Sequence, residues 1–152
     1  MGPAPPPVFD SERSIEREGS SARIEADVTS TRSLVAVVDD SESVRESLPD
    51  LLEQVGFAVQ AFESAEAFLA SDVRDVRCLI LDVGLPGMSG PDLQQELKRR
   101  KKAIPIVFIT AQGDRSLQPR LIAAGAVACL FKPFSDNALL DAVEKAVRTR
   151  EA

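Results

Sequence analysis

Histidine, tryptophan and tyrosine are all missing from this sequence of 152 residues. Without histidine, no imidazole can serve as a catalytic base, a metal ligand or a phosphoryl carrier. Serine–histidine–aspartate catalysis and histidine-based zinc sites are therefore excluded. Cysteine occurs only twice, at Cys78 and Cys129 inside apolar runs. That usage is typical of buried, reduced thiols, and it predicts a cytoplasmic protein without a disulfide framework.

Long apolar runs and an excess of basic residues are also lacking. No run approaches the roughly 20 residues that cross a bilayer, and the proline-rich N-terminus has no apolar core like that of a secretory signal. A formal net charge of −6 argues against nucleic acid as a direct partner. Residues 1–33 hold only isolated apolar side chains, so we predict a disordered leader there and one folded domain over residues 34–150.

From residue 34 onward, short apolar runs alternate with segments of helical periodicity. The runs predict strands over 34–38, 57–62, 78–82, 106–110 and 127–131, and the periodic segments predict helices over 41–55, 64–70, 91–101, 114–124 and 135–148. Pro49 lies inside the first of these helices, where we expect a kink, and Pro119 lies inside the fourth.

Five strand–helix repeats predict an α/β fold with a five-stranded parallel sheet and five helices on its two faces. We expect the flavodoxin-like strand order 2-1-3-4-5, a three-layer sandwich. In this order the fourth strand lies between Cys78 and Cys129, which would place the two thiols about 10 Å apart, too far for a disulfide.

Polar side chains close four of the five strands. Asp39 and Asp40 follow the first, Asp82 ends the third, Thr110 ends the fourth and Lys132 follows the fifth. Because open α/β sheets place their ligands at the carboxyl ends of the strands, we expect these side chains to converge at one rim.

Three carboxylates at one rim repel one another unless a cation joins them, and oxygen ligands favour Mg²⁺. We expect Asp40 and Asp82 to bind the ion directly and Asp39 to bind it directly or through water, with the backbone carbonyl of Gly84 as a further ligand. A metal-bound phosphoryl group could then be attacked by a carboxylate to give an acyl phosphate. Lys132 would contribute a charge to the phosphoryl oxygens, and Thr110 a hydroxyl hydrogen bond.

Each of these residues also has a purely structural interpretation. An aspartate at the end of a strand is often a cap or a turn former, and Lys132 could be an ordinary surface charge. Gly84, Gly87 and Gly90 do not have the spacing of a dinucleotide-binding loop. The prediction depends on the ordered set rather than on any single residue.

The ordered set resembles the receiver domain of two-component response regulators, the FixJ-like branch in particular. The similarity covers about residues 34–148 and is carried by residues 37–45 (VVDDSESVR), 81–90 (LDVGLPGMSG), 105–111 (PIVFITA), 124–126 (AGA) and 132–134 (KPF). It implies a CheY-like fold, Mg²⁺ at Asp39, Asp40 and Asp82, and a cis peptide bond before Pro133. It also implies that a sensor histidine kinase or a phosphotransfer protein phosphorylates Asp82, and that the chain is a signalling switch rather than an enzyme with turnover.

Three features depart from this family. Cys129 stands where the family usually has a phenylalanine or tyrosine that rotates during signalling, so we expect altered coupling from Thr110 to the outer surface. Pro119 lies in the helix that normally relays the signal. Only Glu151 and Ala152 follow the predicted domain over residues 34–150, where FixJ-like regulators carry a DNA-binding module, so a stand-alone receiver that signals to a downstream protein is the expectation.

Other functions stay open at this point. A phosphate-independent interaction module on a receiver scaffold would fit Cys129 and Pro119. A small phosphate-ester hydrolase or nucleotide binder would use the same acids, although the sequence offers neither a phosphate-binding glycine pattern nor a separate general base. The resemblance also implies a possible homodimer through the fourth helix, fifth strand and fifth helix.

Overall fold

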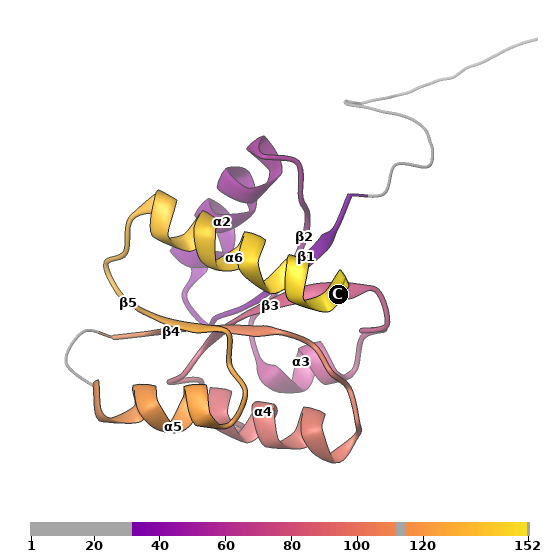
Figure 1. Ribbon diagram of the computed structural model, residues 1–152, viewed down its shortest axis with the longest axis vertical. Helices are drawn as coiled ribbons and strands as arrows, with labels where there is room; N and C mark the ends of the chain where they lie inside the picture. Colours follow the sequence, from indigo (N-terminus) through magenta and orange to yellow (C-terminus); the bar gives the residue numbers. More distant parts are fainter. Residues whose placement is uncertain (1–31, 112–114, 152) are drawn as a thin grey trace, which may run out of the picture. The chain divides into compact units, whose positions relative to one another are not determined.

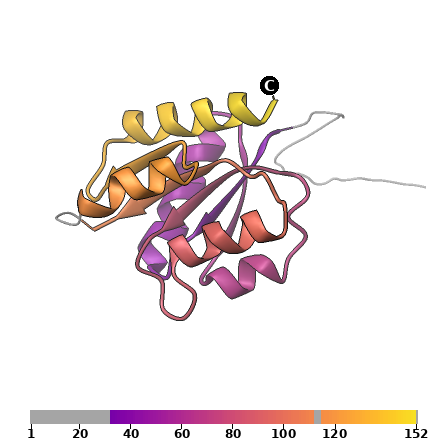
Figure 2. The same ribbon diagram turned by 60° about the horizontal axis from the view of Figure 1, so that its bottom comes forward.

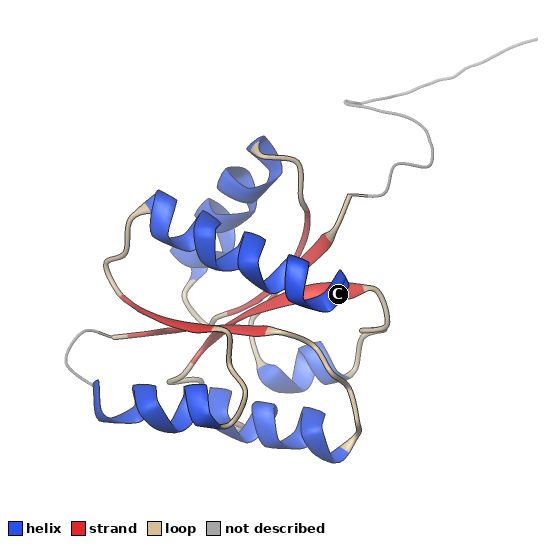
Figure 3. Cartoon of the chain, viewed as in Figure 1, coloured by secondary structure: helices blue, strands red, loops and turns tan. Residues whose placement is uncertain are grey.

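Five apolar runs form the parallel strands of one sheet. The computed structural model describes residues 32–111 and 115–151, and Ser33–Ala152 form one compact unit. The strands are β1 Leu34–Val38, β2 Ala58–Phe62, β3 Val76–Asp82, β4 Ile106–Thr110 and β5 Ala128–Phe131. They pair in the order β2-β1-β3-β4-β5, as Figures 1 and 3 show, so the predicted strand order is confirmed.

Helices cover both faces of the sheet. They are α2 Glu42–Gln54, α3 Ala65–Leu69, α4 Gly90–Arg99, α5 Gln118–Ala123 and α6 Asp136–Glu151. The apolar side chains of α2 and α6 belong to one core cluster, and those of α3, α4 and α5 belong to the other. Figure 2 shows this division into three layers, and the predicted sandwich is confirmed.

Alternating side chains of the strands supply these two cores, because successive residues of a strand point to opposite faces. Val35 and Val37 pack under α2 and α6, whereas Ala36 and Val38 pack against the other helices. The two cysteines follow the same alternation. Cys78 lies in the α2–α6 core and Cys129 in the opposite core, and no disulfide joins them. The sheet itself therefore separates them, in addition to the strand between them.

Local signals in the sequence account for most helix boundaries. The Ser64 hydroxyl accepts a hydrogen bond of 3.0 Å from the Ala67 amide, and Ser135 accepts one of 3.0 Å from Ala138. These are the side-chain caps expected where a helix leaves its first amides without partners. Gly56 follows α2 with a φ of 102°, a left-handed conformation that favours glycine.

The two prolines behave differently. Helix α2 is continuous through Pro49, and the kink expected there stays a prediction. The helix predicted over 114–124 is corrected: a 3₁₀ turn occupies Arg115–Leu117, and α5 begins only at Gln118. Pro119 therefore stands in the first turn of α5 rather than in its middle. Proline is tolerated there because an amide in the first turn has no partner within the helix.

The ends of the chain leave two predictions open. The disordered leader predicted for residues 1–33 lies almost wholly outside the described residues, so it stays a prediction together with the domain boundary at residue 34. Ser33 is described, and its carbonyl accepts a hydrogen bond of 3.0 Å from the Ala58 amide at the start of β2. Among the described residues, no helix combines the length and the apolar character needed to cross a membrane.

Candidate functional site

The carboxyl ends of β1 and β3 bring three aspartates together. Val38 of β1 pairs with Leu81 of β3, so Asp39 and Asp82, the next residues of the two strands, stand at the same level. One carboxylate oxygen from each of Asp39, Asp40 and Asp82 lies within 4.8 Å of the others. The three acids that the sequence singles out thus meet at one rim of the sheet.

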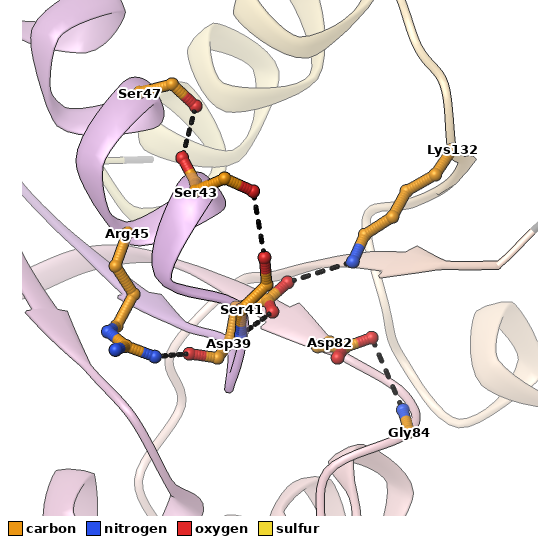
Figure 4. Close-up of polar contacts among 8 residues, drawn as sticks. All are labelled: Asp39, Ser41, Ser43, Arg45, Ser47, Asp82, Gly84 and Lys132. Carbon is orange, nitrogen blue, oxygen red and sulfur yellow. Dashed lines mark hydrogen bonds and ion pairs between the residues drawn. The ribbon is translucent and has the colours of Figure 1, made fainter.

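Lys132 lies at the same rim and contacts Asp39. Its Nζ donates a hydrogen bond of 3.1 Å to Asp39 Oδ2, as Figure 4 shows. The Asp39 side chain is fully buried and the Lys132 side chain is about one third exposed (32%). The lysine amide also donates to the Thr110 carbonyl over 2.8 Å. The Lys132–Pro133 peptide bond is cis, as the family resemblance implies.

Two further contacts hold Asp39 in place, and they come from residues to which the sequence pattern assigns no role. The Ser41 amide donates to Asp39 Oδ1 over 2.8 Å, and the Arg45 guanidinium donates to the Asp39 backbone carbonyl over 3.0 Å (Figure 4). Ser41 precedes α2 and Arg45 lies in its first turns. The six-residue spacing from Asp39 to Arg45 could have indicated the second contact, because a long side chain in the first turns of a helix can reach back to the end of the preceding strand.

Asp82 is almost buried, with an exposed fraction of 8%. The Gly84 amide donates to its Oδ1 over 3.3 Å. Burial raises the pKa of the Asp82 carboxyl above its ordinary value, and the negative charge of Asp39 raises it further. Lys132 and the Gly84 amide act in the opposite direction and do not overcome these effects. In the absence of a cation, this rim therefore carries unbalanced negative charge.

Gly90 sets how closely helix α4 approaches Asp82. A Cβ at this position would stand 2.5 Å from the Asp82 backbone carbonyl oxygen and 3.0 Å from the Val83 Cα. The Gly90 amide donates to the Val83 carbonyl over 3.1 Å. The helix then begins at once, with a reciprocal cap between Ser89 and Asp92. The close approach of Gly90 depends on the folded backbone, so the sequence pattern marks this glycine only as part of a loop.

The loop between β3 and α4 has a second anchor in Glu66 of α3. Its Oε2 accepts a hydrogen bond of 3.0 Å from the Met88 amide. Gly87 precedes Met88 with a φ of 73°, and a Cβ there would stand 2.8 Å from the same oxygen. A glycine at this position thus allows both the turn and the approach of the carboxylate.

Thr110 is the last residue of β4 and is nearly buried, at 5% exposed. Asp82 pairs with Ile109, so Thr110 stands one residue further along the neighbouring strand. On its other side it pairs with Phe131 of β5. The Lys132 amide links Thr110 to the site, because it donates a hydrogen bond to the Thr110 backbone carbonyl.

The donor set at this rim fits Mg²⁺. All the side-chain ligands are carboxylate oxygens, which magnesium prefers over nitrogen or sulfur. Asp40 is exposed, so the site can also hold water, which magnesium usually retains. The raised pKa of Asp82 indicates a charge imbalance that a divalent cation would relieve. Asp39, Asp40 and Asp82 are therefore the residues that would hold the ion.

Comparison with known sequences identifies one family. The family described as the response regulator receiver domain matches residues 35–144. Nodulation protein W of Bradyrhizobium diazoefficiens is 49% identical over 128 residues, which cover 81% of this chain and 56% of that protein. The transcriptional regulatory protein FixJ of Rhizobium meliloti is 44% identical over 114 residues, 74% of this chain and 55% of that protein. The chain thus spans about half the length of these curated relatives.

Solved structures show the same similarity. The response regulator StyR matches with a TM-score of 0.75 and 45% identity, over 80% of this chain and 62% of that one. The FixJ-N crystal structure matches with a TM-score of 0.71 and 41% identity, over 78% of this chain and 96% of that one. The match to FixJ-N covers nearly all of a solved domain, so the whole α/β unit described above has a counterpart in it.

Proposed function

Because this chain belongs to the response regulator receiver domain family, we propose that Asp82 is its phosphoacceptor. Proteins with this domain are response regulators of two-component systems, in which the domain acts as a signalling switch. One observation carries the assignment to Asp82: its carboxylate lies within 4.8 Å of those of Asp39 and Asp40, at a rim that also holds Lys132. The Asp39 carboxylate already accepts hydrogen bonds from Lys132 and Ser41. Asp82 is the other nearly buried acid of the three, and it stands at the end of the central strand.

The proposed transfer is a displacement at phosphorus. A carboxylate oxygen of Asp82 forms the new O–P bond while the P–N bond to the partner's phosphohistidine breaks, and the imidazole nitrogen keeps the electron pair of the broken bond. When bound, Mg²⁺ would neutralise the carboxylates and polarise the phosphoryl oxygens. Lys132 would contribute its positive charge to one of these oxygens, and the Thr110 hydroxyl would donate to another. Gly84 would supply a backbone carbonyl ligand.

The partners proposed here are a sensor histidine kinase or a phosphotransfer protein, and a downstream protein that recognises the phosphorylated surface. A homodimer through α5, β5 and α6 is proposed as well, since Ile122 of α5 is a large apolar side chain that is 41% exposed. Cys129 is buried in the core beneath α5. A thiol there has no ring to rotate, so we expect weaker coupling of Thr110 to this surface than an aromatic residue would give.

Labelling with acetyl phosphate tests the proposal. The parent chain is expected to gain one phosphoryl group when acetyl phosphate and Mg²⁺ are added, and to lose it in hydroxylamine, which cleaves acyl phosphates. The Asp82→Asn variant is expected to gain none, because an amide is not a nucleophile at phosphorus. Omitting Mg²⁺ is expected to abolish labelling of the parent.

The matched control is Asp72→Asn, which changes an exposed aspartate at the other end of β3. It is expected to label like the parent. Equal labelling of Asp82→Asn and the parent would disprove the assignment of the acceptor. Binding of the downstream partner that is unchanged by beryllofluoride, a mimic of the phosphoryl group, would instead indicate a module that works without phosphate.

A further inference from the structure

A cavity lies at the rim of the sheet opposite the aspartates. It has a volume of about 330 Å³, which falls within the range of pockets that hold small molecules. It lies where the C-terminal ends of α4 and α6 approach the starts of β4 and β5. Figure 1 shows the end of α6, marked C, and the end of α4 on the right of the view.

The inner wall of the cavity is apolar. Leu97, Ile104 and Ile106 are nearly buried residues that line it, and Pro105 and Val127 continue the apolar surface. Gln94 also lines it and is only 3% exposed, while its Nε2 donates to the Leu121 carbonyl over 3.3 Å. Such a wall favours an apolar chain or ring, which gains free energy as it leaves water.

Two lysines give the rim of the cavity a positive charge. Lys98 and Lys102 line it, and both are exposed. They belong to the run Lys98-Arg99-Arg100-Lys101-Lys102, in which five cations stand together in a chain of net charge −6. Within the described part of the chain, neither lysine forms an ion pair with a carboxylate. Lys102 does act at longer range on Asp72, whose pKa it helps to lower.

The arginines of the same run have a different environment. Glu96 forms ion pairs with both Arg99 and Arg100. The C-terminal carbonyls of α4 are also occupied, since the amides of Arg100, Lys101 and Lys102 donate to the carbonyls of residues 96–98. The negative end of the helix is thereby capped, and the charge that remains for a ligand at the cavity is that of Lys98 and Lys102.

We propose that this cavity binds a small amphipathic anion, with its apolar chain against Leu97 and Ile106 and its negative group between Lys98 and Lys102. The apolar wall accounts for the chain, and the two lysines account for the sign of the charge. This site is separate from the phosphoacceptor site and does not depend on the function proposed for Asp82.

Titration with sodium octanoate tests the site, with amide proton–nitrogen NMR spectra of the full chain as the readout. Saturable shifts are expected for the amides of residues 97–106 and 124–127. Octylammonium has the same chain with the opposite charge, and it is expected to bind at least tenfold more weakly. Acetate, which has the negative group without the chain, is expected to give no saturable shift in these segments.

The charge contribution is measured with the variant Lys98→Gln/Lys102→Gln. Its affinity for octanoate is expected to fall roughly three- to tenfold, the effect of losing two partly exposed ion pairs. The matched control is Arg99→Gln/Lys101→Gln, which removes two charges from the same run but leaves the cavity rim unchanged, and its affinity is expected to stay within twofold. Ala124→Leu, which fills the cavity, is expected to abolish octanoate binding whether or not the lysines are also replaced.

Each of four results would overturn the proposal. If octylammonium bound as tightly as octanoate, the charge of the ligand would have no influence on binding. Shifts of equal size in the Lys98→Gln/Lys102→Gln variant and its control, or shifts confined to other segments, would place the anion elsewhere. Thermal unfolding of each variant shows whether it is folded, and a folded Ala124→Leu variant that still binds octanoate would equally contradict the site.

Discussion

Two aspartates near opposite ends of β3 have opposite environments. Asp82 ends the strand, is nearly buried beside Asp39, and has a raised pKa. Asp72 precedes the strand, is exposed, and accepts three hydrogen bonds from the Arg74 side chain and one from its amide, which lower its pKa to about 2. The same side chain is thus destabilised as an anion at one rim and stabilised at the other. The rim with excess negative charge is the one at which we propose the cation and the phosphoacceptor.

The largest effect on stability is expected from a substitution that displaces Asp82. Gly90→Ala puts a Cβ within 2.5 Å of the Asp82 carbonyl oxygen. We expect a loss of about 2 kcal/mol or more in the free energy of unfolding, because backbone atoms must move to accept the methyl group. Urea unfolding followed by circular dichroism measures it. Gly84→Ala is the control: its Cβ would meet nothing within 4 Å, and a comparable loss there would contradict the steric explanation.

The next largest difference in stability is expected between two variants that each lose one lysine, at opposite rims of the sheet. Lys132→Ala leaves the buried Asp39 carboxylate without its ammonium partner, and we expect a loss of about 1–2 kcal/mol, reduced from the fully buried case because Lys132 is one third exposed. Lys102→Ala at the opposite rim is expected to change stability by less than about 0.5 kcal/mol. Urea unfolding of both variants in one buffer tests this, and equal losses would show that the ion pair contributes nothing.

Neutralising Asp82 should stabilise the chain when Mg²⁺ is absent. A raised pKa means that the folded state binds the proton more tightly than the unfolded state, so stability falls as the pH rises from the ordinary aspartate range through the raised pKa of Asp82. At neutral pH we therefore expect Asp82→Asn to be more stable than the parent by about 1 kcal/mol. The difference should vanish at acidic pH, where Asp82 is protonated in both states.

Unfolding measured in EDTA across this pH range is the check, and added Mg²⁺ should remove the advantage of the variant by stabilising the parent. An Asp82→Asn variant less stable than the parent at neutral pH would mean that the carboxylate is well compensated without a cation. Asp72→Asn should show no such stabilisation at any pH.

The smallest effect is expected at Asp72. Replacing Arg74 with glutamine removes the side-chain hydrogen bonds that contribute most to lowering the pKa of Asp72 to about 2, while the backbone amide of residue 74 can still donate, so that pKa should rise toward 3.8. Because the pair is fully exposed, stability should not change measurably. A titration of the Asp72 carboxyl carbon by NMR measures the pKa directly. An unchanged pKa in Arg74→Gln would show that another group, such as Lys102, controls this carboxyl.

The sequence predicted the elements that depend on local pattern. Strand order and the convergence of the strand-end residues follow from periodicity and spacing. The contacts made by Gly90, Arg45 and Glu66 could not be predicted, because each joins atoms that only the folded backbone brings together. The start of α5 was misplaced because the helical pattern before Pro119 is equally compatible with a 3₁₀ turn.

Predictions about function depend on different information. The convergence of Asp39, Asp40 and Asp82 follows from strand order, but which acid takes a phosphoryl group does not. Contacts and exposure separate these acids: Asp39 is held by Lys132, Asp40 is exposed, and Asp82 is nearly buried, with a pKa raised by that burial. None of these properties can be read from the position of an aspartate at the end of an apolar run.

The most direct measurement locates the phosphoryl group on the chain. After reaction with acetyl phosphate and Mg²⁺, borohydride reduction converts a phosphorylated aspartate to homoserine, which mass spectrometry of peptides can assign to a residue. The assignment of the phosphoacceptor to Asp82 predicts homoserine at position 82 alone, and none when EDTA replaces Mg²⁺. Homoserine at Asp39, Asp40 or Asp72, or the same yield at position 82 in EDTA, would contradict it.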